Sequence, residues 1–199
     1  MNLVERAKNI LLAPAKEWEV IKGEPLSTRE MYTKYAMILA AIPAVAGFIG
    51  RSFIGYNVWG VVSCIPVATG LTWAVVYYIL SLVGVYLLGF IIDSLAPSFG
   101  AKKDMNGSLK VAIFSSTALW VVGIFYIIPI LSILAILGLY SLYLLYGGMK
   151  TIKEPPQDKL VGYYIVTLIA GLVLSVIISV VVTALVLGGY GAMGGMRGY

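Results

Sequence analysis

Three long stretches without a charged residue dominate this sequence, at residues 52–92, 111–149 and 160–196. A bilayer core about 30 Å thick is crossed by about 20 helical residues, so each stretch is long enough to cross it. Inside a membrane every backbone polar group needs a partner within the protein, which excludes irregular chain facing lipid. The sequence therefore predicts an all-α membrane protein that crosses the bilayer several times.

The number of crossings follows from the lengths of these stretches and from the proline inside the second one. As a single helix, residues 111–149 would be roughly 60 Å long at about 1.5 Å per residue, twice the bilayer core. Pro129 lies near their middle and disfavours helix at the residue before it, so it is the natural turn of a hairpin. We expect five transmembrane helices in a bundle, at about 31–50, 67–92, 111–128, 130–149 and 160–187. Residues 51–65 are expected to form an interfacial or re-entrant connection, and the Gly-rich residues 188–199 a flexible tail.

The distribution of Lys and Arg predicts the orientation. With the N-terminus inside, the basic residues of 1–34, 102–110 and 150–159 all lie on the inner face, and only Arg51 and Arg197 lie outside. Lys and Arg in short loops are retained on the cytoplasmic side. We therefore expect a cytoplasmic N-terminus, a C-terminus outside, residues 1–34 as a cytoplasmic segment and 35–187 as the membrane domain. The expected location is the plasma membrane of a prokaryote.

The N-terminal segment has the pattern of an amphipathic helix. Leu3, Val4, Ala7, Ile10 and Leu11 fall on one helical face, and Pro14 ends the pattern. Two arrangements explain such a helix equally well. It lies in the interface, among the headgroups of the cytoplasmic leaflet, or it packs on the cytoplasmic loops of the bundle itself.

The residues that most enzymes use are scarce. The chain has no histidine and one cysteine, Cys64, which excludes imidazole metal sites, histidine general bases and Ser-His nucleophiles. We expect no enzyme, no metal and no cofactor. A net charge of +5 also does not indicate nucleic acid, because the basic residues mark loops of a membrane protein.

Asp93 is the one acidic residue directly next to a membrane helix. A carboxylate at membrane depth is a functional-site candidate by default. At a helix end it has a structural alternative, in which it is hydrated, caps the chain reversal before Pro97 or pairs with Lys110 at the start of the third helix. We expect the structural role, which would shape the loop 94–108.

Small and hydroxyl-bearing residues recur within the spans. On the last helix Thr167, Gly171, Ser175, Ser179 and Thr183 are spaced four apart, which predicts a helix-packing stripe. Such a stripe allows a homo-oligomer without requiring one. Residues 115–117, Ser-Ser-Thr on the third helix, are the best candidates for lining a pore, although no acidic or basic residue accompanies them at membrane depth.

Four segments taken in order resemble a known family: YLLGFIIDSLAPSFGAKKD (86–104), LKVAIFSSTALW (109–120), IFYIIPILSILAILGLYSLYLLYGGM (124–149) and PPQDKLVGY (155–163). The chain is similar to the prokaryotic branch of the Yip family, the Ypt/Rab-GTPase-interacting integral membrane proteins. The resemblance implies five membrane helices, a cytoplasmic N-terminus and no catalytic residues. Its eukaryotic members are adaptors in vesicle traffic that associate with small GTPases. They carry a long cytosolic region before the first span, whereas residues 1–34 precede it here, so GTPase binding is not carried over.

The resulting functional prediction is a non-enzymatic membrane adaptor or organiser. It would present the loops 94–108 and 151–160 to a cytoplasmic or membrane protein partner, with the lipid bilayer as its surroundings. The residues expected to bind the partner or shape the loops are Asp93, Pro97, Phe99, Gly100, Lys102, Lys103, Asp104, Lys110, Gly162 and Tyr163. The alternative prediction is a small transporter or channel for a lipid or solute.

Overall fold

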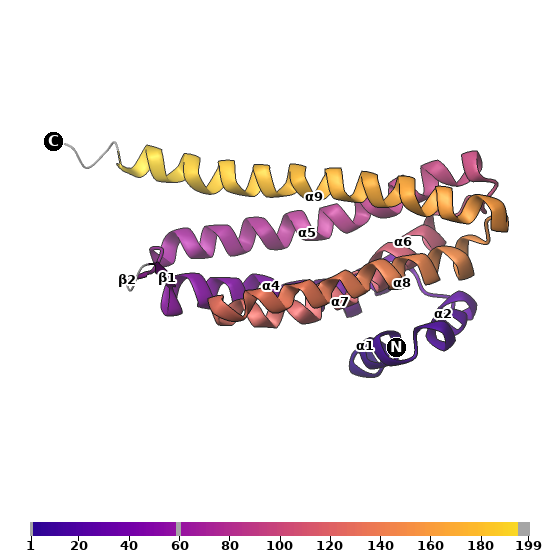
Figure 1. Ribbon diagram of the computed structural model, residues 1–199, viewed down its shortest axis with the longest axis horizontal. Coiled ribbons are helices and arrows are strands. Elements are labelled where there is room, and N and C mark those ends of the chain that lie inside the picture. Colours follow the sequence, from indigo (N-terminus) through magenta and orange to yellow (C-terminus); the bar gives the residue numbers. More distant parts are fainter. Residues whose placement is uncertain (1, 59–60, 195–199) are drawn as a thin grey trace.

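A computed structural model describes residues 2–58 and 61–194, and these residues are almost entirely helical (Figure 1). Five helical segments are long and apolar enough to cross a membrane, which confirms the all-α fold class with five transmembrane helices. They are Thr28–Ile54, Val67–Phe99, Met105–Ile127, Pro129–Lys153 and Gln157–Val186. The ends of these segments lie within seven residues of the expected ones.

Most spans are composed of several helical pieces. The α-helices are α1 (Leu3–Leu12), α2 (Pro14–Gly23), α3 (Thr28–Met31), α4 (Met37–Ile49), α5 (Val67–Leu95), α6 (Met105–Ser115), α7 (Thr117–Val122), α8 (Tyr140–Gly148) and α9 (Gln157–Gly194). The π-helical pieces are η1 (Tyr32–Ala36), η2 (Gly50–Ile54) and η6 (Met149–Lys153), and the 3-10 pieces are η3 (Ala96–Phe99), η4 (Gly123–Ile127) and η5 (Pro129–Leu139). One short antiparallel hairpin, β1 (Tyr56–Val58) with β2 (Val61–Ser63), lies within the connection 51–65 and pairs Tyr56 with Ser63.

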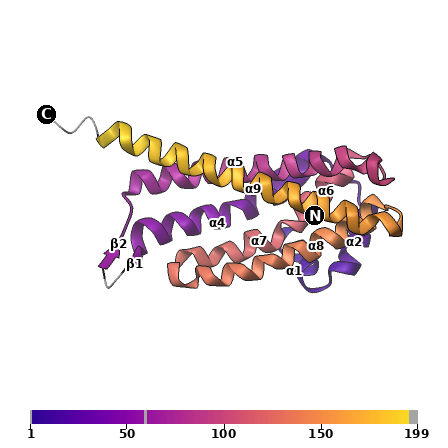
Figure 2. The ribbon, with the colours of Figure 1, turned by 45° about the horizontal axis from the view of Figure 1, so that its top comes forward.

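The spans form two layers (Figures 1 and 2). One layer contains α5 and α9, which pack along each other, and the other contains α4, α7 and α8. α5 joins the layers because it also packs against α4 and α6, whereas α9 packs mainly on α5. The last span is therefore the peripheral one.

The third and fourth spans form the predicted hairpin. Ile128 is extended between η4 and η5, and Pro129 begins η5, which confirms the turn at this proline. The third span is also interrupted at Ser116, between α6 and α7. Hydroxyls there donate to carbonyls one turn back, Ser116 to Ala112 at 2.8 Å and Thr117 to Phe114 at 2.7 Å. Such back-bonding bends helices, which explains the interruption.

The two ends of the bundle differ in composition. We call the end with residues 96–104 and 153–156 the basic end, and the end with β1, β2 and the Pro129 turn the hairpin end. The largest buried cluster lies toward the basic end, where Tyr35, Phe114 and Tyr163 are fully buried. The side of the membrane on which each end lies stays a prediction.

The N-terminal helices pack on the bundle. Ile10, Trp18 and Ile21 are fully buried in the same cluster as Phe114, and α1 and α2 contact α7 and α8. The segment therefore packs on the protein, as one of the two expected arrangements has it, although it does so against α7 and α8 of the spans. Ile10 of the amphipathic pattern is thus buried inside the protein, whereas Val4 is 71% exposed. The place of the segment relative to the membrane interface stays a prediction.

The flexibility expected of residues 188–199 stays a prediction. α9 continues as a helix through Gly194, and residues 195–199 lie outside the described residues.

Candidate functional site at the basic end

Two loops meet at the basic end and are held together by backbone and ring contacts. We call residues 94–108 and 151–160 the paired loops. The Lys102 N–H donates to the Lys153 carbonyl at 2.9 Å. The Phe99 ring stacks on the Tyr163 ring, with centroids 5.2 Å apart and planes at 16°. These contacts join the loop between the second and third spans to the end of the fourth span and to the last span.

Gly100 makes the sharp turn of the first loop possible. It ends the 3-10 piece η3 with φ +65°, a left-handed conformation that side chains with a Cβ disfavour. The Ala101 N–H then donates to the Ala96 carbonyl at 2.9 Å, which closes the turn. The chain reversal therefore rests on this glycine, with Pro97 in the first turn of η3.

Asp104 begins the third span as its N-cap. Its carboxylate accepts from the backbone N–H groups of Asn106 and Gly107, both at 3.1 Å. Capping of this kind satisfies donors that have no partner within the helix. The Asn106 side chain in turn donates to the Leu26 carbonyl at 3.0 Å, which connects the loop to the N-terminal segment.

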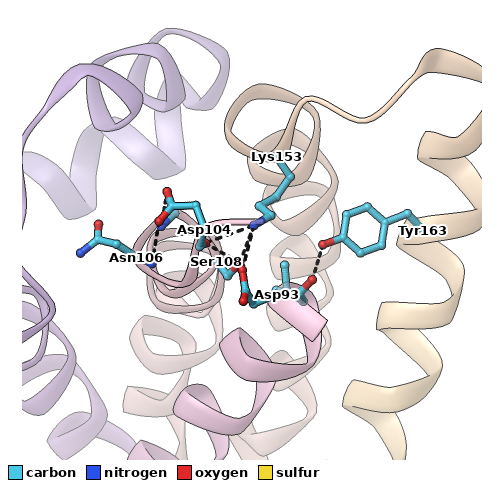
Figure 3. A network of polar contacts seen from close by, with 8 residues as sticks. Asp93, Asp104, Asn106, Ser108, Lys153 and Tyr163 are labelled. Carbon is cyan, nitrogen blue, oxygen red and sulfur yellow. Dashed lines mark hydrogen bonds and ion pairs between the residues drawn. The ribbon is translucent and has the colours of Figure 1, made fainter. Parts of the chain in front are cut away.

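A buried polar network underlies the paired loops (Figure 3). Lys153 is fully buried, and its Nζ donates to Ser108 Oγ at 2.7 Å, to the Asp104 carbonyl at 3.1 Å and to Asp93 Oδ1 at 3.4 Å. The Ser108 hydroxyl lies 3.2 Å from the same Asp93 oxygen. The Tyr163 hydroxyl donates to the carbonyl of Ile92, next to Asp93. The second, third, fourth and last spans thus meet around one buried ion pair.

The pairing of Asp93 with Lys110, one of the structural alternatives for Asp93, does not form. Lys110 Nζ instead donates to the carbonyls of Ile21 at 2.8 Å and Glu24 at 2.6 Å, at the C-terminal end of α2. A cation is favourable where helix carbonyls lack partners. Lys110 therefore fixes the N-terminal segment, and Lys153 takes the place beside Asp93.

A second buried ion pair holds α1 on α2. Arg6 binds Glu17 at 2.5 Å and also contacts Glu24, and its guanidinium lies over the Phe114 ring, 5.8 Å from the centroid. Arg6 and Glu17 are both buried. Their pairing offsets the cost of burying each charge alone.

An exposed ion pair joins α2 to the second loop. Lys22 bonds to Glu154, and this hydrogen bond raises the pKa of Lys22 and lowers the pKa of Glu154. Because both side chains are largely in solvent, the pair contributes little to stability. Glu154 has a positive φ of 47° at the point where η6 ends.

The structure separates the predicted loop residues into two groups. Lys102, Lys103 and Pro97 are exposed. Asp93, Phe99, Gly100, Asp104, Gly162 and Tyr163 contribute to internal contacts, with Gly162 lying under the Phe99 ring. Ser108 and Lys153 were not among the predicted site residues. A basic residue at the end of the fourth span was the available signal for Lys153, because charges near membrane depth need partners.

The predicted packing stripe on α9 changes its surroundings along the helix. Thr167 is fully buried and Gly171 faces Leu88 of α5, whereas Ser175, Ser179 and Thr183 are exposed. The Ser175 and Thr183 hydroxyls donate to carbonyls of their own helix. Packing of the exposed residues Ser175, Ser179 and Thr183 against another chain stays a prediction.

The candidate pore residues of the third span are buried and internally bonded. Ser115 and Ser116 donate to the Ala112 carbonyl, and the Thr117 hydroxyl also contacts the Tyr35 hydroxyl at 2.7 Å. These groups have their hydrogen-bond partners inside the protein, so their burial needs no water-filled path. Within the described part of the chain, no group of three or more Asp, Glu, Cys or His residues is arranged to hold a metal ion.

Five apolar helices, joined at one end by interlocked basic loops, define a multi-pass helical membrane protein. The model of the Yip1 domain matches residues 8–179, so the chain belongs to the Yip1 domain family. It is similar to the inner membrane protein YohC of Escherichia coli, in strains K12 and O6:H1, with 30% identity over 118 residues. The match spans 59% of this chain and 60% of each relative. No solved structure matches the chain.

The family match confirms the resemblance seen in the sequence. A relative in the inner membrane and five candidate spans also agree with the expected location, a multi-pass protein in the plasma membrane of a prokaryote.

Proposed function

We propose that this protein is a non-enzymatic membrane adaptor that presents the paired loops to a cytoplasmic protein partner. The observation that carries the proposal is the backbone bond from Lys102 to Lys153, which joins the two loops into one surface. The stacked rings of Phe99 and Tyr163 support the same surface from below. A surface ordered before binding loses less entropy when a partner docks.

The chemistry of this surface favours binding over catalysis. The carboxylates of Asp93 and Asp104 and the ammonium of Lys153 are occupied by internal contacts. Lys102 and Lys103 are exposed and adjacent, which suits a partner surface that carries carboxylates. The surface would therefore bind its partner through its exposed positive charge and its fixed shape.

In-cell photo-crosslinking tests the proposal. A photoreactive residue at Lys103 or Ser98 is exposed, whereas one at Phe99 would break the stacking on Tyr163. We expect a reproducible protein adduct from both positions, identified by mass spectrometry. A probe at Cys64, exposed near the hairpin end, is the matched control and should not yield that adduct.

Charge reversal then distinguishes docking from chance proximity. Lys102→Glu together with Lys103→Glu changes exposed side chains only, so the melting temperature should stay the same while the adduct from Ser98 is lost. Asp104 is left intact because it caps α6. An adduct of unchanged yield in this folded double variant would refute the proposal.

A further inference from the structure

An apolar groove of about 300 Å³ lies between α1 and the hairpin of the third and fourth spans. It is lined by Leu11, Ala118, Val121, Val122, Leu137 and Tyr140. The one side-chain polar group of this lining, the Tyr140 hydroxyl, donates to the Leu11 carbonyl at 3.0 Å. The lining therefore selects for an apolar occupant.

The groove lies at membrane depth. Ala118, Val121 and Val122 belong to the candidate span Met105–Ile127, and Leu137 and Tyr140 belong to Pro129–Lys153. Leu137 is 55% exposed, so the groove is open on the outer face of the fourth span. An occupant that enters from there comes out of the bilayer itself.

The end of the groove at α1 has a different chemistry. Val4, Lys8 and Leu12 are exposed and spaced four apart, so they follow one face of α1 beside Leu11. Leu12 is 73% exposed although it is apolar, and Lys8 lies one turn before it. An apolar groove next to an amphipathic strip with a lysine matches an acyl chain below an anionic headgroup.

We propose that this groove holds one acyl chain of an anionic glycerophospholipid, whose phosphate lies beside Lys8. The acyl chain runs along α7 and η5, on the side that faces α1, and Leu12 lies at the level of the glycerol. A helix of a second copy is the competing occupant, and the oligomeric state of the groove variants below tests it. The site is separate from the paired loops and does not depend on the adaptor role.

Filling the groove tests the acyl-chain site. Val121→Trp places an indole in the groove, and Val180→Trp makes the same change on α9, where Val180 is 62% exposed. Each protein is purified in mild detergent from membranes that contain phosphatidylglycerol, and its retained lipid is measured by native mass spectrometry. We expect about one lipid per chain in the wild type and in Val180→Trp. Retention by Val121→Trp should fall about tenfold or more, because a buried acyl chain gains affinity with each methylene.

Leu137→Trp serves where Val121→Trp fails to fold, because Leu137 is partly exposed and tolerates a larger side chain. Equal retention by a folded groove variant and by Val180→Trp would mean that lipid only adsorbs around the spans, and would overturn the site. A wild-type dimer that Val121→Trp converts to monomer, with no bound lipid in either form, would overturn it as well.

The headgroup is tested separately with Lys8→Glu, and Lys159→Glu is the control at an exposed lysine on α9. In equal mixtures of phosphatidylglycerol and phosphatidylcholine, the wild type and Lys159→Glu should retain mainly phosphatidylglycerol. Lys8→Glu should lose this preference while retaining the same total amount of lipid. An unchanged preference in Lys8→Glu would overturn the placement of the phosphate.

Discussion

At the scale of single residues, the buried ion pair of Lys153 and Asp93 predicts an asymmetric response to mutation. Their side chains are only 1% and 12% exposed. Lys153→Met removes one partner and leaves a buried carboxylate uncompensated, which costs about 3 to 5 kcal/mol. We expect Asp93→Asn/Lys153→Met to recover most of this loss, measured by equilibrium unfolding in mixed micelles. Lys22→Met, at an exposed ion pair, is the control and should change little. A double variant as unstable as Lys153→Met would contradict the assignment.

Gly100 is the residue at which the backbone of the paired loops is most sensitive. Its positive φ disfavours any Cβ, so Gly100→Ala should cost about 1 to 2 kcal/mol. Gly162→Ala is the matched control, because a Cβ there meets only the Phe99 ring at an ordinary 3.4 Å and alanine favours the helix. Both values come from the same unfolding measurement. If the two substitutions behaved alike, the left-handed turn would not be what limits this loop.

At the scale of elements, the docking of α1 and α2 depends on Trp18. Its ring is buried against Phe114, and a Cβ added at Gly148 would lie only 2.8 Å from it. Trp18→Ala removes a large buried side chain, a change that costs about 3 to 5 kcal/mol. We expect faster amide hydrogen exchange throughout α1 and α2, with the spans unaffected. Val20→Ala, on the exposed side of α2, should leave exchange at the wild-type rate. Protection of α1 that survives in Trp18→Ala would contradict this docking.

At the scale of the whole molecule, the lone cysteine reports the orientation. Cys64 is exposed and follows β2 at the hairpin end, whereas Lys103 is exposed at the basic end. If Lys and Arg determine the orientation, a membrane-impermeant maleimide should label Cys64 in intact spheroplasts. Lys103→Cys in a Cys64→Ser background should react only after the membrane is permeabilised. The reverse pattern would place the basic end outside and would also remove the paired loops from any cytoplasmic partner.

The number of spans, the hairpin at Pro129 and the grouping of the basic loops could be predicted from the sequence. These properties depend on the lengths of uncharged stretches, which must match the thickness of the bilayer core, and on local backbone chemistry. The family followed from the order of segments around Asp93 and Pro129 and was confirmed by the Yip1 domain match.

The partners of the buried charged side chains became known only from the tertiary structure. Asp93 pairs with Lys153, 60 residues away, instead of the nearer Lys110, and Lys110 holds the end of α2. A helix that is apolar all round carries little information about the direction it faces, so the rotation and tilt of each span come from packing. The same packing brings Leu11 of α1 beside Tyr140 and creates the groove between them. Contacts between distant segments depend on that geometry, which hydropathy and spacing do not specify.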